Sequence, residues 1–253
     1  MTQRLEGTVA LVTGASSGIG HATALELARE GASVALVGRR EDRLTDLAAE
    51  ISQAGGKALA VPADITTSQA AAEAVERTVQ GLGRLDTVVN NAGLMLLGPT
   101  PGADLSEWQR MIDINLMGLM YTTHAAIPHL VKAATDGPRQ VSDIVNISSL
   151  NGRHAFAMSA VYSATKFGVG GFSEALRQEL GRQHVRVSVV EPGSVDTELR
   201  THNSDVVQQL IAAGLGDIER LQSQDIADAV GYIVTRPRHV SVNELLVRPT
   251  EQV

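Results

Sequence analysis

Short apolar runs alternate with longer amphipathic segments along almost the whole chain. Most of these runs are continuous rather than alternating in polarity, which is typical of strands covered by helices on both faces. The predicted strands are residues 8–13, 33–38, 57–62, 85–90, 142–147, 185–190 and 244–248. The predicted helices are residues 19–29, 42–53, 68–80, 106–133, 160–182 and 224–235. This alternation predicts an α/β fold, a doubly wound (Rossmann-type) sheet of about seven parallel strands with helices on both faces.

The domain organisation follows from the same pattern. We find no linker rich in Ser, Pro or Gly and no internal repeat. We therefore expect a single domain over residues 1–253. Residues 194–223 are the least regular stretch, and we expect them to cover the substrate.

Composition narrows the functional classes. The chain is 43% hydrophobic and 19% charged, which excludes a mostly disordered chain. A formal net charge of −7 argues against nucleic-acid and anionic-membrane partners. The absence of cysteine excludes disulfides and Cys-ligated zinc, and the seven histidines show no metal-ligand spacing. Without a secretory h-region or an apolar run of about 20 residues, we expect a cytoplasmic protein with no membrane segment and no metal.

A glycine-rich turn follows the first predicted strand. The stretch from Thr13 to Gly20 reads TGASSGIG and leads into a helix. Such a turn lets backbone amides and a helix N-terminus face a pyrophosphate. Its G-x-x-x-G-x-G spacing differs from the commoner G-x-G-x-x-G, and a purely structural turn is the alternative. The candidate cofactor contacts here are Gly14, Ser16, Ser17, Gly18 and Ile19.

The end of the second strand indicates which dinucleotide binds. An acidic residue about 20 positions after the turn commonly holds the ribose of NAD, whereas an arginine accommodates the 2′-phosphate of NADP. Here Gly38 stands in place of the acid, followed by Arg39 and Arg40. A guanidinium is always charged and can bind a phosphate in a bidentate way. This favours NADP(H), with two solvated loop charges as the alternative.

Taken together in order, the motifs resemble those of the short-chain dehydrogenase/reductase family. The resemblance rests on the TGASSGIG turn, the NNAG stretch at 90–93, Asn115, Ser149, the YSATK stretch at 162–166, and Pro192 with Gly193. It covers essentially the whole chain. Within the family, the segments NNAGLMLLG and YSATKFG and the ending RPTEQV resemble reductases that make clavulanic acid from its aldehyde. That similarity supports aldehyde or ketone reduction and leaves the substrate open.

The resemblance implies further cofactor contacts. Asp64 and Ile65 would lie beside the adenine, although Asp64 is equally suited to capping the following helix. The adenosine ribose region would be lined by Asn91, Ala92 and Gly93. The nicotinamide end would be held by Pro192, Gly193, Val195 and Thr197, and also by Tyr162 and Lys166.

The expected chemistry centres on Tyr162 and Lys166, four residues apart on one helix face. The ammonium should lower the phenol pKa from about 10, which makes Tyr162 an acid/base near neutral pH. By the resemblance, Ser149 would bond the substrate carbonyl oxygen, Lys166 the nicotinamide ribose, and Asn115 a water leading to solvent. The family spacing selects Ser149 over the adjacent Ser148. Taken alone, a helical Tyr/Lys pair is more typical of surface packing.

These features favour an NADPH-dependent reductase acting on the carbonyl of an aldehyde or ketone. One alternative is an alcohol or sugar dehydrogenase working in the oxidative direction, and another is a non-catalytic dinucleotide sensor. Arg153 and His154 are candidates for binding a polar substrate group, with loop solvation as the alternative. By the resemblance, the helices carrying Asn115 and Tyr162 would pair between subunits, and we expect a homotetramer.

Overall fold

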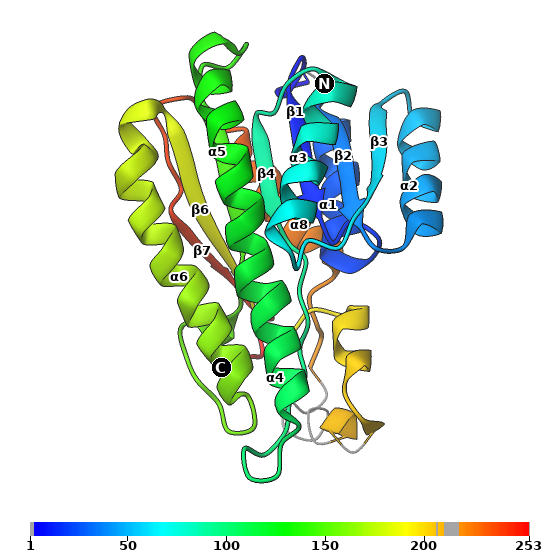
Figure 1. Ribbon diagram of the computed structural model, residues 1–253, viewed down its shortest axis with the longest axis vertical. Helices are drawn as coiled ribbons and strands as arrows, with labels where there is room; N and C mark the ends of the chain where they lie inside the picture. The colour runs from blue at the N-terminus through cyan, green and yellow to red at the C-terminus, as the bar shows by residue number, and fades with distance from the viewer. Residues whose placement is uncertain (1–2, 206, 210–217, 253) are drawn as a thin grey trace.

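The strands of the computed structural model, which describes residues 3–205, 207–209 and 218–252, form one parallel sheet (Figure 1). Its order is β3-β2-β1-β4-β5-β6-β7, and every neighbouring pair is parallel. The strands are β1 (Val9–Thr13), β2 (Ser33–Gly38), β3 (Lys57–Pro62), β4 (Thr87–Asn90), β5 (Ser142–Ile147), β6 (Val185–Pro192) and β7 (Glu244–Val247). The predicted doubly wound sheet is thereby confirmed.

Helices cover both faces of the sheet and form a hydrophobic core on each side. One core contains residues of α1 (Gly18–Arg29), α2 (Glu41–Gln53) and α8 (Ser223–Val234). The other contains residues of α3 (Ser68–Leu82), α5 (Leu119–Asp136) and α6 (Ala160–Leu180). Strands β4, β5 and β6 are buried at every position, because helices remove both of their faces from water.

The predicted helix at 106–133 is divided in the structure. It consists of α4 (Leu105–Ile112), a π-helical turn η1 (Asp113–Gly118) and α5. The wider turn places Asn115 in the interior, where only 1% of its surface is exposed. Periodicity along the sequence does not reveal the inserted residue, because the apolar face resumes after it. Among the residues that the structure describes there are also three short 3-10 helices: η2 (Leu150–Gly152), η3 (Gly181–Gln183) and η4 (Glu198–His202).

The carboxyl ends of the strands meet at one edge of the sheet. The chain order reverses between β1 and β4, which is where ligands bind in open α/β sheets. The segment after β6, drawn in gold in Figure 1, lies beyond this edge. Residues from the turns after β1, β4, β5 and β6 are thereby brought to one place.

An ion-pair network stabilises the opposite edge. The carboxylate of Asp143 accepts hydrogen bonds from Arg186 (2.7 and 3.0 Å) and from Arg139 (3.0 Å). Arg186 also donates to the carbonyls of Val234 and Val240. It therefore joins β5 and β6 to the connection between α8 and β7.

Candidate active site

The glycine turn between β1 and α1 needs glycine for two different reasons. Gly14 and Gly18 have φ values of 66° and 55°, a left-handed conformation that side chains disfavour. A Cβ on Gly14 would also lie 2.8 Å from Cα of Ala92. Asn91 fixes this contact by donating from Nδ2 to the carbonyls of Thr13 (3.0 Å) and Gly14 (3.3 Å). The turns after β1 and β4 therefore pack directly on one another.

The amino end of α1 fits a pyrophosphate. Ser17 is the N-cap residue, and its side chain makes no capping hydrogen bond to the helix. The first helical amides thus remain available, and the helix dipole favours an anion beside them. Gly14, Ser16, Ser17, Gly18 and Ile19 all lie in this turn.

The two arginines after β2 differ in their surroundings. Arg40 donates from Nη2 to the hydroxyls of Ser16 (2.9 Å) and Ser17 (2.7 Å), so it is bound to the glycine turn rather than solvated. Arg39 is exposed, and its guanidinium has no hydrogen-bond partner among the residues that the structure describes. Both residues follow the strand end at which a ribose 2′-phosphate would be expected.

Asp64 and Ile65 follow β3. Asp64 does not cap α3: its Oδ1 accepts from the amide (3.1 Å) and hydroxyl (2.9 Å) of Thr66. Thr67 is the N-cap, accepting from the amide of Ala70 (3.3 Å). The capping alternative for Asp64 is therefore wrong, because the helix begins later. Ile65 is buried, and contact of either residue with an adenine stays a prediction.

Ser149, Tyr162 and Lys166 are brought together at the ends of β5 and α6. Tyr162 and Lys166 are only 5% and 6% exposed, and the Lys166 Nζ lies 5.7 Å from the centre of the Tyr162 ring. The Ser149 side chain lies close enough to the Tyr162 phenol to lower its pKa. Lys166 donates to the carbonyl of Ile147 (2.9 Å). The helical pair is thus an interior feature rather than surface packing.

The pKa of Tyr162 moves opposite to the expectation. Burial raises it to about 12, and the nearby Ser149 side chain lowers it only in part. Burial also lowers the pKa of Lys166 to about 8. The loss of solvation dominates because the ammonium is bonded to the Ile147 carbonyl rather than to the phenol oxygen. Within the protein alone, Tyr162 is therefore a protonated acid at neutral pH.

Asn115 holds the wall of the site with its side chain. Its Oδ1 accepts from the amide of Leu94 (2.7 Å), and its Nδ2 donates to the Leu94 carbonyl (2.8 Å) and to Thr165 (3.3 Å). Both N–H groups of the side-chain amide thus donate to protein groups, and a water bound by Asn115 stays a prediction.

Two other polar residues near the site have structural partners. The Ser148 hydroxyl is buried and donates to the Lys166 carbonyl (3.3 Å), which agrees with the choice of Ser149. Arg153 pairs with Glu191 on β6 and Glu244 on β7, so its guanidinium has two carboxylate partners, and its contact with a substrate stays a prediction. His154 is exposed.

The segment after β6 returns to the glycine turn. The Gly193 amide donates to Val247 (2.7 Å), and the Ser194 amide donates to Oε1 of Gln252 (2.9 Å). Val195 forms a bridge with Leu221, and a Cβ on Gly18 would lie 3.3 Å from Thr197. Thr197 therefore lies beside the turn, and a nicotinamide-holding role for Pro192, Gly193, Val195 and Thr197 stays a prediction. Of the covering segment expected at 194–223, residues 206 and 210–217 lie outside the described residues.

Asn203 is a residue that sequence reasoning missed. Its Oδ1 accepts from the amide of Leu97 (2.7 Å), and its Nδ2 donates to the carbonyl of Met95 (3.0 Å). Asn115 and Asn203 thus hold the 94–97 segment from two different elements. No sequence signal connects Asn203 to residues more than a hundred positions away.

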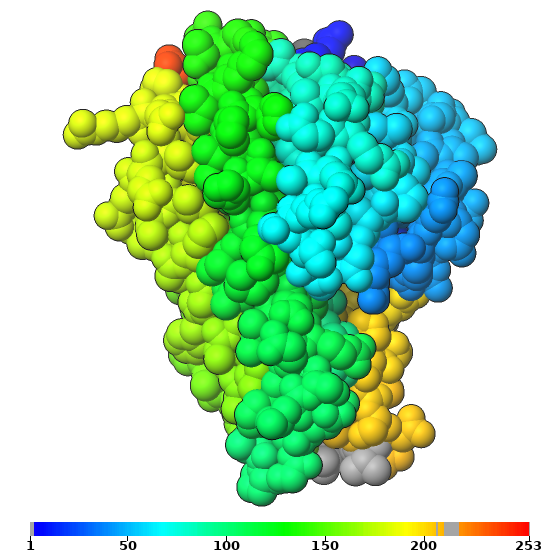
Figure 2. All heavy atoms as spheres, in the orientation of Figure 1, coloured from blue at the N-terminus to red at the C-terminus, as the bar shows by residue number. Residues whose placement is uncertain are grey.

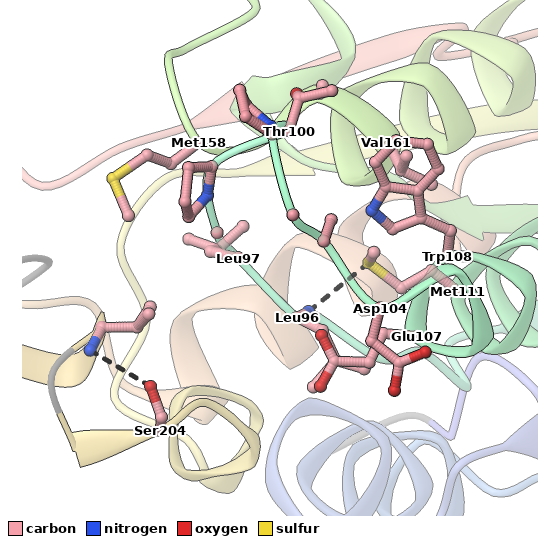
Figure 3. A pocket seen from close by; sticks show the side chains of 17 residues that line it. Leu96, Leu97, Thr100, Asp104, Glu107, Trp108, Met111, Met158, Val161 and Ser204 are labelled. Carbon is pink, nitrogen blue, oxygen red and sulfur yellow. Dashed lines mark hydrogen bonds between the residues drawn. The ribbon is translucent and has the colours of Figure 1, made fainter.

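A cavity of about 270 Å³ lies next to this segment (Figure 3). Leu96 and Leu97 line it, as an apolar pocket wall would. Trp108 and Met111 of α4 and Val161, the neighbour of Tyr162, also line it. The spacing of Trp108 and Met111 on α4 indicated only an apolar helix face. The sequence therefore did not predict that these side chains line a cavity.

Comparisons with known proteins agree with this geometry. A family model described as short chain dehydrogenase matches residues 8–207. An uncharacterized oxidoreductase of Staphylococcus aureus is 38% identical over 246 residues, covering 97% of this chain and 98% of the relative. A metagenomic short-chain oxidoreductase solved with NADP is 34% identical with a TM-score of 0.81, covering 98% of this chain and 99% of that one. The closed form of a serine dehydrogenase with NADP+ is 32% identical with a TM-score of 0.88, covering 97% and 96%.

The fold and the site define an NADP-dependent oxidoreductase. The chain belongs to the short-chain dehydrogenase/reductase family. The closer similarity to clavulanic acid-forming reductases stays a prediction. In the described ranges, no helix has both the length and the apolar character that a bilayer crossing needs.

Proposed function

We propose that the enzyme reduces the carbonyl of an aldehyde or ketone with NADPH, and that Tyr162 donates the proton to the carbonyl oxygen. The observation that carries this proposal is the grouping of the buried Tyr162 and Lys166 with the half-buried Ser149 at the carboxyl end of the sheet. The bound coenzyme would supply the hydride.

The protonation states suit the reductive direction. With a pKa near 12, the phenol of Tyr162 is in the acid form that carbonyl reduction consumes. The phenolate left after proton transfer is stabilised by the Ser149 hydroxyl and by the nearby charge of Lys166. Ser149 would also orient the carbonyl oxygen. Lys166, with a pKa of about 8, is mostly charged at pH 7.

A dehydrogenase working in the oxidative direction is the second candidate. It is favoured by the similarity to a serine dehydrogenase solved with NADP+. In that direction Tyr162 would have to lose its proton first, which its raised pKa opposes. A non-catalytic sensor would not need the four residues Asn115, Ser149, Tyr162 and Lys166 that are all present here.

The test is Tyr162→Phe, assayed by NADPH oxidation with aldehydes, ketones, quinones and acyl thioesters. We expect turnover to fall by about 10²–10⁴-fold, the usual contribution of a general acid, with the dissociation constant of NADPH unchanged. Tyr232→Phe is the matched control, because Tyr232 is 51% exposed on α8. Near-normal turnover of Tyr162→Phe would refute the proton-donor role.

We also propose a homotetramer that pairs through α4–α5 and α6. Figure 2 shows α5 as a column between α6 and α3, on one broad face of the molecule. On α6, Phe167 is 47% exposed, and a Cβ at Gly170 or Gly171 would meet nothing within 4 Å. These features leave an apolar and smooth face for a second copy. A monomer mass at micromolar concentration in sedimentation equilibrium would reject the proposal.

A further inference from the structure

Glu198 reaches from η4 to the arginines that follow β2. Its Oε2 accepts from Nη1 of Arg40 (2.9 Å), and its Oε1 accepts from Nη1 of Arg43 (2.7 Å). The residues are 158 and 155 positions apart in the chain. The two guanidinium groups lower the pKa of Glu198 to about 2, so its carboxylate is ionised throughout the neutral range.

The surroundings of this carboxylate suit a phosphate equally well. Arg40 is held beside the glycine turn by the hydroxyls of Ser16 and Ser17. Arg43 lies in the first turn of α2, next in space to the end of β2. Guanidinium groups bind carboxylate and phosphate with the same fork of N–H donors. The carboxylate of Glu198 therefore occupies the guanidinium groups that the 2′-phosphate of NADP(H) would need.

The two anions cannot share these cations without cost. The Nε and Nη2 of Arg40 are bonded to Ser16, which leaves Nη1 for an incoming anion, and one of the two N–H groups of Nη1 already donates to Glu198. A doubly charged phosphate next to an ionised carboxylate is also repelled by it. NADH carries no 2′-phosphate and meets neither obstacle. The competition therefore acts on NADP(H) alone.

We infer that Glu198 is a specificity-determining residue of the cofactor site: its carboxylate exchanges with the 2′-phosphate of NADP(H) on Arg40 and Arg43. The exchange links coenzyme choice to the segment after β6, since Glu198 lies between Thr197 at the glycine turn and Asn203 at the 94–97 segment. The inference rests on the assignment of the 2′-phosphate to the turn after β2.

The test is Glu198→Gln, which keeps the shape of the side chain and removes its charge. Dissociation constants would be measured by isothermal titration calorimetry for 2′,5′-ADP, 5′-AMP, NADPH and NADH. The two pairs are about half exposed, and exposed ion pairs contribute little to binding, so the expected change is modest. We therefore expect 2′,5′-ADP and NADPH to bind about three- to tenfold more tightly, with 5′-AMP and NADH unchanged.

Glu174→Gln is the matched control. Glu174 is also exposed, and an arginine, Arg177, likewise lowers its pKa to about 2, but it lies on α6. The change in net charge is the same, so this variant should leave all four dissociation constants as in the wild type.

The outcomes separate the inference from its premise. If both wild-type protein and Glu198→Gln bind 2′,5′-ADP no better than 5′-AMP, the assignment of the 2′-phosphate to this turn is wrong. If it binds 2′,5′-ADP better, but Glu198→Gln leaves that preference unchanged or weakens it, the competition does not occur and the inference is overturned. Far-ultraviolet circular dichroism of each variant establishes that the fold is retained.

Discussion

Gly20→Ala tests whether the contact between the turns after β1 and β4 is as close as the structure shows. Gly20 lies in the first turn of α1, and its φ does not require glycine. A Cβ there would lie 2.8 Å from the carbonyl carbon of Gly14, and closer still to the Gly14 oxygen and to Nδ2 of Asn91. Backbone must therefore move by about 1 Å, and overpacking of this kind costs about 1–3 kcal/mol.

A further loss of stability comes from the side-chain amide of Asn91. Its bonds to Thr13 and Gly14 would be strained or broken, at about 0.5–1.5 kcal/mol each. Alanine returns about 0.5–1 kcal/mol through its higher helix propensity. We expect a net loss of about 1–5.5 kcal/mol in the free energy of unfolding. The NADPH dissociation constant should rise at least about tenfold, because the turn that faces the pyrophosphate is displaced.

The assay is urea denaturation followed by circular dichroism, together with fluorescence titration of NADPH. Gly181→Ala is the control: its φ of −57° is helical, and its Cβ would meet nothing within 4 Å. That variant should be equal to wild type or up to about 1 kcal/mol more stable. Equal effects of the two substitutions on stability and on NADPH binding would refute the close-approach argument.

Three further predictions concern stability, pH and the wall of the site. Asp143→Asn should lower the free energy of unfolding, measured by urea titration, by about 3–5 kcal/mol, because it leaves the buried Arg186 without its counter-ion. A loss below about 1 kcal/mol would contradict a stabilising role for this ion pair. Reductive turnover should be full below pH 8 and fall as the pH rises through about 8, where Lys166 loses its proton; a profile flat to pH 10 would exclude this role. Asn203→Ala should lower kcat/KM about tenfold with NADPH affinity unchanged, because the Leu97 amide loses its acceptor; an unchanged kcat/KM would show that the contact does not position the wall.

Much of the candidate site was predictable because its parts are local in sequence. Tyr162 and Lys166 lie one helical turn apart, so any helix places them on one face. The glycine turn joins a strand directly to a helix, and its geometry is set within a few residues. Parallel strands bring their carboxyl ends to one edge, so residues following β1, β4, β5 and β6 meet without further information.

The direction of the Tyr162 pKa shift was not predictable in the same way. A helical ammonium one turn away suggests a lowered pKa, but burial of the phenol raises it. Burial is a property of everything packed around a side chain, and Lys166 turns to the Ile147 carbonyl instead. The π-helical turn at Asn115 is similar, since it accommodates hydrogen bonds to Leu94 from another element.

The sequence by itself determined the parallel sheet, the glycine turn, the spacing of Tyr162 and Lys166, and the arginines that favour NADP(H). All of these follow from backbone periodicity and from residues near one another in the chain. Only the tertiary structure decided that Glu198 holds Arg40 and that Arg153 pairs with Glu191. Such contacts depend on the path of loops between packed elements, and no local preference of the backbone specifies that path.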